Sequence, residues 1–556
     1  MKPDRLEHSS WMDAFFASYY EHRPVNATFI GMHDMDGRLP DFSEQGLGDT
    51  LADARSLLSR SDDAHESRTA LETIDRRLAR GFLKIQDWEL SSAHFHRGNP
   101  SLYTGEAIFG ILGLFLTDFA PLAQRVDAAT SRMNAVPDLL AKARANVRRS
   151  PTDWTQRAIR ECDGALALFT DGIAALVAGH AINSRHFTDA ATNAAEAFAN
   201  HRAYLEAELL PRTSDQYACG AEALARYLQN GHFLEQSAEE IVRYAENEMA
   251  EAEAYLTAHA PDFGASTVSE VLAGLADSHP QATDYEASYL AAWEEVRRIS
   301  EKNELLTWPD FPIRYVPRPQ WTEKAAPYLC FLFYRSPAAF NRPDVHDYLI
   351  APLPEAERTA FLRSNNHGVI KLNHVVHHGG IGHHVQNWHA FRAQSRVGQI
   401  AAVDCAFRIA MFCGGTMAEG WACYATDLAA EFSALTPREE YAEVHSRVRM
   451  AARALVDIRL HLGELTLQDA ADYYEARAGM SSAAARGEAV KNSMFPGAAI
   501  MYLMGTDAIH GLRRDMMQRE GADFELCRFH DTFLSYGSIP VSLIAEDMKT
   551  KAAHAE

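Results

Sequence analysis

The clearest chemical feature of the sequence is a group of histidines in its second half. Six of the 25 histidines lie within sixteen residues: His374, His377, His378, His383, His384 and His389. Neutral imidazole is the commonest protein ligand of zinc, copper, nickel and iron, and His-rich tracts are typical of metal sites. A lone histidine is more often an ordinary core residue, but six in one glycine-broken segment predict a metal site.

The spacing of these histidines predicts an irregular helix. A regular helical site takes two histidines four residues apart, as in the HExxH pattern. His374 and His378 have that spacing, but no glutamate occupies the HExxH position between them. His377 and His383 are separated by the glycine-rich stretch 379–382. Both can reach one ion only where a helix is bulged or interrupted, which glycines permit.

A metal site also needs negative charge and usually a further ligand. Glu419 lies in the run TMAEGWACYATDLAAE at 416–431, whose apolar residues predict a buried helix. A carboxylate in such a helix is costly unless it is paired or bound to a cation. Spacing alone leaves two interpretations of Glu419 about equal, a metal ligand or a helix-surface glutamate.

The elements that hold these residues are predicted to be mainly α-helical. Ser9 or Ser10 is expected to cap a first helix that buries Trp11, Phe15 and Tyr19. Apolar residues three and four apart predict a long amphipathic helix over 157–178. Thr466, with Asp469 three residues later, predicts the start of a helix that ends at Gly479.

One region differs from this helical pattern. Between 312 and 352 proline is frequent, and aromatic and branched residues gather in PIRYVPRP, YLCFLFYRSP and HDYLIAPLP. We expect two or three short strands here, as a small sheet or hairpin that walls a cleft beside the histidines. No Ser/Gly-rich linker or repeat divides the chain, so residues 1–556 are expected to form one large helical domain with a central cleft, either as one body or as two lobes around that cleft. The metal-site segment is expected at 370–435.

Composition limits the classes of partner. The 556 residues include 53 Lys and Arg against 75 Asp and Glu, a formal net charge of −22. A chain this acidic repels phosphate backbones, so no nucleic-acid partner is expected.

Cysteine usage and hydropathy bear on localisation. The seven cysteines form no CxxC pair, which favours buried thiols in a reducing compartment. The opening MKPDRLEHSSWMDAFF lacks the apolar core of a signal peptide, and the longest apolar run, 108–116, is too short to cross a bilayer. We expect a cytoplasmic protein without a membrane partner.

Several ordered segments resemble one known family. They are YYEHRPVNATFIGMHDMDGRLPDFS, RGNPSLY, HHGGIGHHVQ, EGWACYATDLAAE, LVDIRLHLGELTLQDA, MFPGAAIMYLMG and FHDTFLSYGSIP. On these motifs the chain is identified as a member of a bacterial family catalogued as domain of unknown function 885. That family looks like a relative of the helical zinc metallopeptidases of the thimet-oligopeptidase type, which implies a similar architecture here.

The resemblance implies roles for particular residues. The family's metal ligands correspond to His377, to His383 or His384, and to Glu419. Tyr502 corresponds to a phenol able to stabilise an oxyanion. Asp457 and His461 correspond to a motif with an acid and a histidine, and we count both as candidate catalytic residues. The implied cofactor is one divalent transition metal, with zinc expected and iron, manganese or nickel as alternatives.

Two departures from the family pattern bear on the chemistry. His378 stands where the family has the glutamate that takes a proton from water, and Thr426 replaces a second acid. Ile381 also replaces a proline, and an alanine at 498 or 499 replaces a glutamine. The ligands therefore look retained while the peptidase acid–base residues do not.

Three functions follow from this pattern. The first is a metal-dependent hydrolase of a peptide, amide or related bond in a small molecule or short peptide, with His378 as the general base. The second is a lyase or isomerase acting on a small acid or amino-acid derivative, with the metal as Lewis acid. The third is an inactive relative that binds a metal or a peptide. We rank them in that order, because the ligands are present and the family's catalytic acid is missing.

Overall fold

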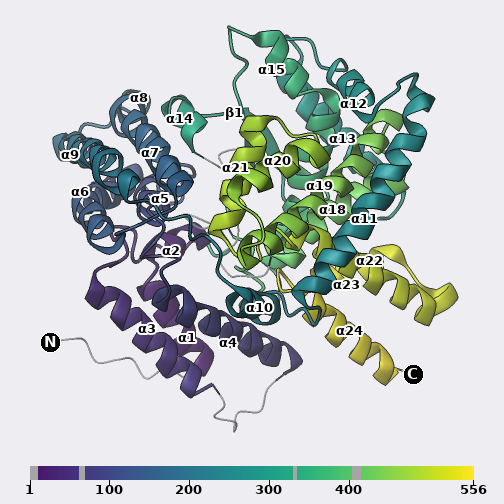
Figure 1. Cartoon of the computed structure of the whole chain (residues 1–556), viewed down its shortest axis with the longest axis horizontal. Helices are drawn as coiled ribbons and strands as arrows, with labels where there is room; N and C mark the ends of the chain where they lie inside the picture. The colour runs from purple at the N-terminus through teal and green to yellow at the C-terminus, as the bar shows by residue number, and fades with distance from the viewer. Residues whose placement is uncertain (1–9, 62–68, 330–334, 404–414, 556) are drawn as a thin grey trace.

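The computed structural model describes residues 10–61, 69–329, 335–403 and 415–555. These residues are mainly helical, as expected (Figure 1). The helices of the first half are α1 Trp11–Glu21, α2 Pro24–Ile30, α3 Glu44–Ser59, α4 Ala70–Ser91, α5 Ser101–Leu112, α6 Leu122–Asn146, α7 Thr152–Ala167, α8 Ile173–His180, α9 Arg185–Tyr204, α10 Ala221–Asn230, α11 Ala238–His259, α12 Val268–Ala276 and α13 Tyr285–Lys302.

The second half continues in the same way. Its helices are α14 Gln320–Glu323, α15 Arg358–Ser364, α16 His367–Val369, α17 His383–Ala390, α18 Thr416–Glu431, α19 Pro437–Leu462, α20 Leu467–Ala478, α21 Ser482–Met494, α22 Met501–Glu520, α23 Leu526–Leu534 and α24 Val541–Ala555. Three π-helical segments interrupt the pattern, namely η1 Leu168–Gly172, η2 Leu205–Leu209 and η6 Ile370–Gly379.

Local signals placed several helix ends correctly. The Ser10 hydroxyl accepts from the Asp13 N–H at 3.2 Å, which begins α1. Thr466 and Asp469 form a capping box before α20, and Gly479 ends that helix in the left-handed region at φ 62°. The helix expected over 157–178 is α7 and α8, with the π-turn η1 between them. Each of these ends is set by residues within four positions of it.

The two strands form a parallel pair, and the hairpin alternative was therefore wrong. β1 Ile313–Pro317 pairs with β2 His346–Ile350, Ile313 lying opposite His346. Parallel strands need a crossover rather than a tight turn. The middle of the three expected strands falls partly on 330–334, outside the described residues. The Tyr348 hydroxyl of β2 lies 2.6 Å from His374 Nδ1, so the sheet supports the histidine segment.

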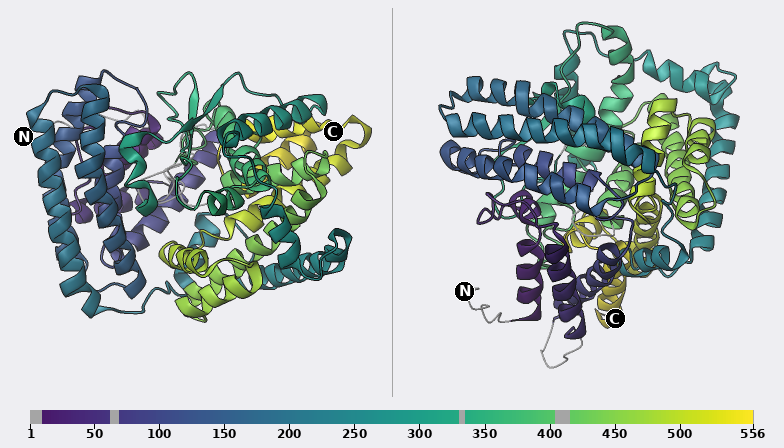
Figure 2. Two further views of the ribbon diagram at one scale, coloured as in Figure 1. Left: turned by 90° about the horizontal axis from the view of Figure 1, so that it is seen from above. Right: turned by 60° about the vertical axis from the view of Figure 1, so that its left-hand side comes forward.

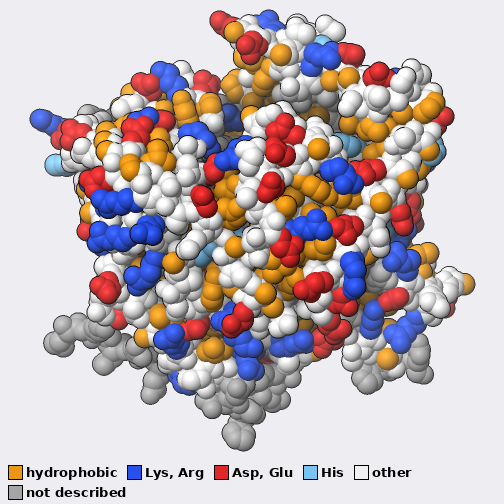
Figure 3. Space-filling view, in the orientation of Figure 1, with side chains coloured by type: hydrophobic (Ala, Val, Ile, Leu, Met, Phe, Trp, Pro, Cys, Tyr) orange, Lys and Arg blue, Asp and Glu red, His pale blue; other side chains and the backbone are white. Residues whose placement is uncertain are grey.

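Both ends of the chain contribute to one hydrophobic core. Phe15 and Leu83 lie in the same buried cluster as Phe533 and Ile544. Helices α5 to α9 pack round a second cluster, and α11, α19, α20 and α21 round a third. Figure 2 shows the α6–α9 layer beside the helices of the second half. On the face shown in Figure 3, acidic and basic side chains are interspersed.

One helical run among the described residues, Thr152–His180, is long and apolar enough by length and composition to cross a bilayer. The core helix of a globular protein passes the same test. This run packs against α5 and α9 and buries Leu168, Phe169 and Leu176 in the second cluster. The core therefore accounts for part of its apolar character, since 44% of its apolar window is buried.

The shared core predicts the response to limited proteolysis. Cleavage in exposed segments should not release a separately stable half, because residues near both ends pack in one cluster. Recovery of two fragments that each melt cooperatively, measured by circular dichroism after chromatography, would contradict a single domain.

Candidate metal centre

The histidine segment is an interrupted helix, as the spacing indicated. The π-helix η6 carries His377 and His378, and α17 begins at His383 after a short turn. In that turn the Gly382 N–H donates to the Val376 carbonyl at 2.9 Å. A Cβ on Gly382 would lie 1.9 Å from the His377 carbonyl oxygen, so only glycine fits there. π-Helical irregularities within helices are frequent at functional sites.

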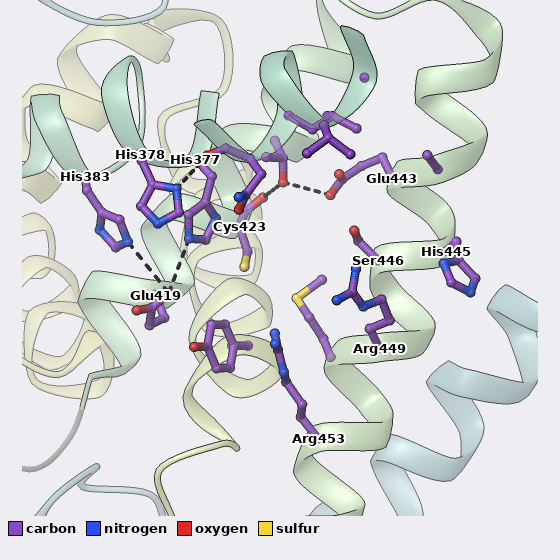
Figure 4. Close-up of a pocket in the computed structure, with 18 of the residues that line it drawn as sticks. His377, His378, His383, Glu419, Cys423, Glu443, His445, Ser446, Arg449 and Arg453 are labelled. Carbon is purple, nitrogen blue, oxygen red and sulfur yellow. Dashed lines mark hydrogen bonds and ion pairs between the residues drawn. The ribbon is translucent and has the colours of Figure 1, made fainter. Parts of the chain in front are cut away.

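Three imidazoles and one carboxylate converge at this break (Figure 4). One ring nitrogen each of His377, His378 and His383 lie within 4.8 Å of one another. Glu419 Oε2 lies 3.4 Å from His377 Nε2 and 3.7 Å from His383 Nε2. Glu419, in the first turn of α18, is only 4% exposed. The structure therefore brings together four of the sequence-predicted site residues.

Neighbouring groups orient two of the rings. The His378 Nδ1–H donates to the Asn373 carbonyl at 2.6 Å, so a neutral His378 ring carries its proton on Nδ1 and its lone pair on Nε2. His383 Nδ1 donates to Gln386 Oε1 at 3.0 Å, and the Gln386 amide donates to Ser538 Oγ at 3.0 Å. Such outer hydrogen bonds set the tautomer and direction of metal-binding histidines.

Close helix packing places the carboxylate. The Trp421 indole N–H donates to the Ile381 carbonyl at 2.9 Å, which ties α18 to the turn between η6 and α17. Gly420 faces Gly505 of α22, and a Cβ on Gly420 would lie 2.5 Å from the Gly505 carbonyl carbon. The two glycines let α18 and α22 cross closely, so Tyr502 of α22 lines the same pocket as Glu419.

The electrostatics of the cluster suit a cation. Burial lowers the pKa of His377 and of His378, which leaves both rings neutral. Burial works to raise the pKa of the Glu419 carboxyl, but its interactions with the adjacent His377 and His383 side chains hold that pKa well below its usual value. Neutral nitrogens around one buried carboxylate are the donor set of a divalent transition metal. The residues present thus fit the implied ion.

The Tyr502 phenol keeps its proton. Burial and the negative charge of Glu419 raise its pKa well above the usual value. The Arg453 guanidinium lies 4.6 Å from the centre of the Tyr502 ring. Tyr502 is therefore a hydrogen-bond donor in the pocket, the state that oxyanion stabilisation requires.

The cluster lines a cavity of about 640 Å³ whose other wall belongs to α19. Glu443, Ser446, Arg449 and Arg453 lie on that wall, facing the histidines (Figure 4). The sequence analysis did not single out these residues. Their spacing of three, three and four residues along one helix was the available signal, because it places polar side chains on one helical face.

Glu443 is a carboxyl group in an unusual state. Thr426 Oγ1 lies 2.7 Å from Glu443 Oε1 and 2.6 Å from the Cys423 carbonyl. Burial and the nearby charge of Asp427 raise the pKa of Glu443 to about 8. Thr426 replaces an acid of the family pattern, and the structure places another acid in contact with it.

Three candidate residues lie elsewhere. His384 turns away from Glu419: its Nε2 donates to the Phe311 carbonyl at 2.8 Å, and its ring stacks on Phe311. Asp457 accepts from the Gly497 N–H at 3.0 Å and the Ala499 N–H at 2.7 Å. His461 Nε2 donates to the Asn492 carbonyl at 2.9 Å. None of the three lines the cavity.

The structure does not bring Asp457 and His461 to the cavity, so their catalytic role stays a prediction. Both side chains are fully buried and bind backbone groups of the segment 492–499, just before α22. They thus hold the backbone that leads into the helix carrying Tyr502. The structure likewise places His383, and not His384, beside Glu419.

Comparisons with known proteins agree with this fold. A family model described as "Bacterial protein of unknown function (DUF885)" matches residues 24–548. A solved structure from Shewanella oneidensis has a TM-score of 0.78 at 21% identity, and one from Colwellia psychrerythraea 0.79 at 16%. Each match covers 98% of this chain and 100% of the other. Both are described as putative lipoproteins, the first as one of unknown function. No curated protein matches the chain.

The glycine break is testable by substitution. Gly382→Ala should destabilise the protein by on the order of 1–3 kcal/mol, because its Cβ overlaps a backbone carbonyl. Gly487→Ala, at an open site in α21, is the matched control and should stabilise by about 0.5–1 kcal/mol. Urea unfolding of both variants measures the difference. Equal stability of the two would show that the turn tolerates a side chain.

The raised pKa of Glu443 predicts a pH-dependent stability. The Glu443 carboxyl ionises with a pKa near 4.5 in the unfolded chain and near 8 in the folded protein. Its protonated form therefore contributes fully to the free energy of unfolding below pH 4.5, and this contribution is lost as the pH rises through 8. In metal-free protein, the melting temperature of Glu443→Gln should exceed that of the wild type increasingly up to about pH 8 and then level off. Glu440→Gln, exposed on the same helix, is the control. A constant difference from pH 5 to pH 9 would contradict the raised pKa.

Proposed function

The chain belongs to the bacterial DUF885 family, and from its pocket we propose that it is a metal-dependent hydrolase of a peptide, amide or related bond in a small molecule or short peptide. The observation that carries the proposal is the convergence of His377, His378, His383 and Glu419 on the wall of one cavity. The likeness of the family's motifs to those of thimet-oligopeptidase-type peptidases supports the choice of bond.

The four donors would hold one divalent ion. His377, His383 and Glu419 are the set that the motifs imply, and His378 adds a third ring nitrogen, which lies within 4.8 Å of those of His377 and His383. Zinc suits nitrogen and carboxylate donors, and iron, manganese and nickel are alternatives. When bound, such an ion supplies Lewis acidity to a substrate carbonyl and to water.

The protein's own groups would then manage charge and protons. The Tyr502 phenol would donate a hydrogen bond to the carbonyl oxygen as that oxygen gains negative charge. Hydrolysis adds the oxygen of water to the carbonyl carbon, breaks the carbon–nitrogen bond and delivers a proton to the leaving nitrogen. Glu443, protonated near neutral pH, is the pocket's carboxyl donor for that proton.

His378 takes a different role in this proposal from the glutamate that it replaces. A general base needs to reach water, whereas a ring nitrogen of His378 lies within 4.8 Å of a nitrogen of each of the other two rings. We therefore assign it as a ligand, and the proton transfer to Glu443. The Glu443 carboxyl gives its proton to the leaving nitrogen and then takes back one of the two protons of the attacking water, while the other leaves with the carboxylic acid product. A histidine in place of the glutamate at 378 is also compatible with the second function, a lyase or isomerase acting on a small acid. In that function the additional neutral nitrogen ligand would support a metal that acts as a Lewis acid.

Localisation stays a prediction. The two solved relatives are described as lipoproteins, which suggests an envelope location for proteins of this fold. Their identity to this chain, 21% and 16%, carries the fold alone. The cytoplasmic expectation rests on composition.

The metal assignment is tested by elemental analysis. Tag-free protein should contain close to one equivalent of a transition metal, and His377→Ala or Glu419→Ala should lose most of it. His378→Ala should weaken metal binding about 10-fold or more, since it removes a donor. The exposed His367→Ala is the control and should retain wild-type content. Wild-type metal in the His377 and Glu419 variants would refute the site.

Activity is tested with the same proteins. N-acyl amino acids and dipeptides should be cleaved by the metal-loaded wild type, and Glu443→Gln should lower turnover by roughly 10²–10⁴ while metal content stays the same. If His378→Ala instead keeps its metal and loses turnover, His378 is the base. A metal-loaded protein that cleaves none of these compounds but transforms a small acid would favour the second function.

A further inference from the structure

The wall opposite the histidines carries an unneutralised positive charge. Arg449 of α19 lines the cavity, is exposed within it, and makes no hydrogen bond or ion pair with any other residue that the structure describes. Neighbouring arginines of the same helix are paired. Arg447 binds Asp507 at 2.7 Å, and Arg453 binds Glu488 at 2.8 Å.

The charges around Arg449 do not compensate it. Glu443 lies on the same face, but its carboxyl is mostly neutral near pH 7 because burial raises its pKa to about 8. Desolvation by the surrounding protein and the charge of Arg453 lower the pKa of Arg449, and the charge of Glu488, the ion-pair partner of Arg453, only partly offsets them. Glu419 carries a negative charge, but His377 and His383 are its partners. Lys491 adds a further cation to the lining.

A guanidinium in this position is suited to one kind of ligand. Arginine presents a planar set of N–H donors that matches a carboxylate in a bidentate way. A cavity of about 640 Å³ admits a molecule of drug or di- to tripeptide size. Figure 4 shows Arg449 on the wall that faces His377, His378 and His383 across the pocket.

We propose that Arg449 binds a carboxylate of the substrate, so that the substrate is a short N-acyl amino acid or peptide with a free carboxylate. The inference rests on the proposed function, because it takes the histidine wall as the place of bond cleavage. Arg449 holds the anionic end, and the carbonyl to be attacked then lies toward Glu419 and Tyr502. Because the cavity is small, binding of the substrate carboxylate by Arg449 also limits cleavage to bonds close to that carboxylate.

The test compares pairs of compounds that differ only in charge. N-acetyl amino acids and N-acetyl dipeptides are assayed against their C-terminal amides with the metal-loaded protein. The free acids should have a kcat/KM about 10-fold to 100-fold above the amides, the discrimination that one charge-assisted pair provides. Compounds whose only carboxylate is an Asp or Glu side chain, with an amidated C-terminus, identify which carboxylate is bound.

Variants locate the discrimination. Arg449→Ala should bring the ratio of acid to amide near one, chiefly by raising KM for the acids, with metal content unchanged. Arg449→Lys should restore part of the preference for acids over amides. Arg459→Ala removes a positive charge from the same helix outside the pocket, and it should leave this preference intact. A ratio that survives in Arg449→Ala, or is lost in Lys491→Ala alone, overturns the assignment.

A binding measurement separates this inference from the proposed function. Calorimetry of the zinc-loaded protein with each acid and amide needs no turnover. If nothing is hydrolysed but the acids bind more tightly in an Arg449-dependent way, the hydrolase proposal fails and the carboxylate site stands. If wild-type protein binds or cleaves acids and amides equally, the carboxylate site is refuted whatever the activity.

Discussion

The buried carboxylate of Glu419 is the constraint on which the rest of the site depends. A carboxylate this far from solvent is stable only with partners that stabilise its charge. His377 and His383 provide them, and both can do so only because the helix breaks between them. The glycines of the break, the indole of Trp421 on the turn and the amide of Gln386 on His383 all serve that convergence.

The position of Glu419 also depends on the close packing of α18 against α22. The contact of Gly420 with Gly505 brings α18 and α22 together, so a phenol and a carboxylate from distant segments share one cavity. Asp457 and His461 hold the backbone before α22, and hence the direction from which Tyr502 enters. Residues that resemble catalytic groups in sequence thus contribute to the site through backbone geometry.

The two departures from the family pattern are linked to different walls of the pocket. Histidine at 378 adds a nitrogen to the wall of the cavity that carries His377 and His383, while threonine at 426 contacts an acid contributed by α19. An acid is therefore present in the cavity despite its loss from the motif. The same helix contributes the unpaired Arg449, so α19 supplies the polar groups that face the donors. In the proposed hydrolase, the histidines and Glu419 on one wall would bind the metal. Glu443 and Arg449 on the opposite wall would supply the proton and bind the substrate carboxylate.

The sequence by itself determined the features that depend on near neighbours. The helix caps at Ser10 and Thr466, the broken helix at 379–382 and the helical class all follow from interactions within a few residues. Motif spacing also singled out Glu419, whose burial then followed from its apolar helix. The tertiary structure alone decided between His383 and His384, made the strands parallel, and brought Glu443 and Arg449 opposite the histidines. Those outcomes depend on how helices distant in sequence pack, and hydrophobic periodicity specifies which face is buried but not which partner covers it.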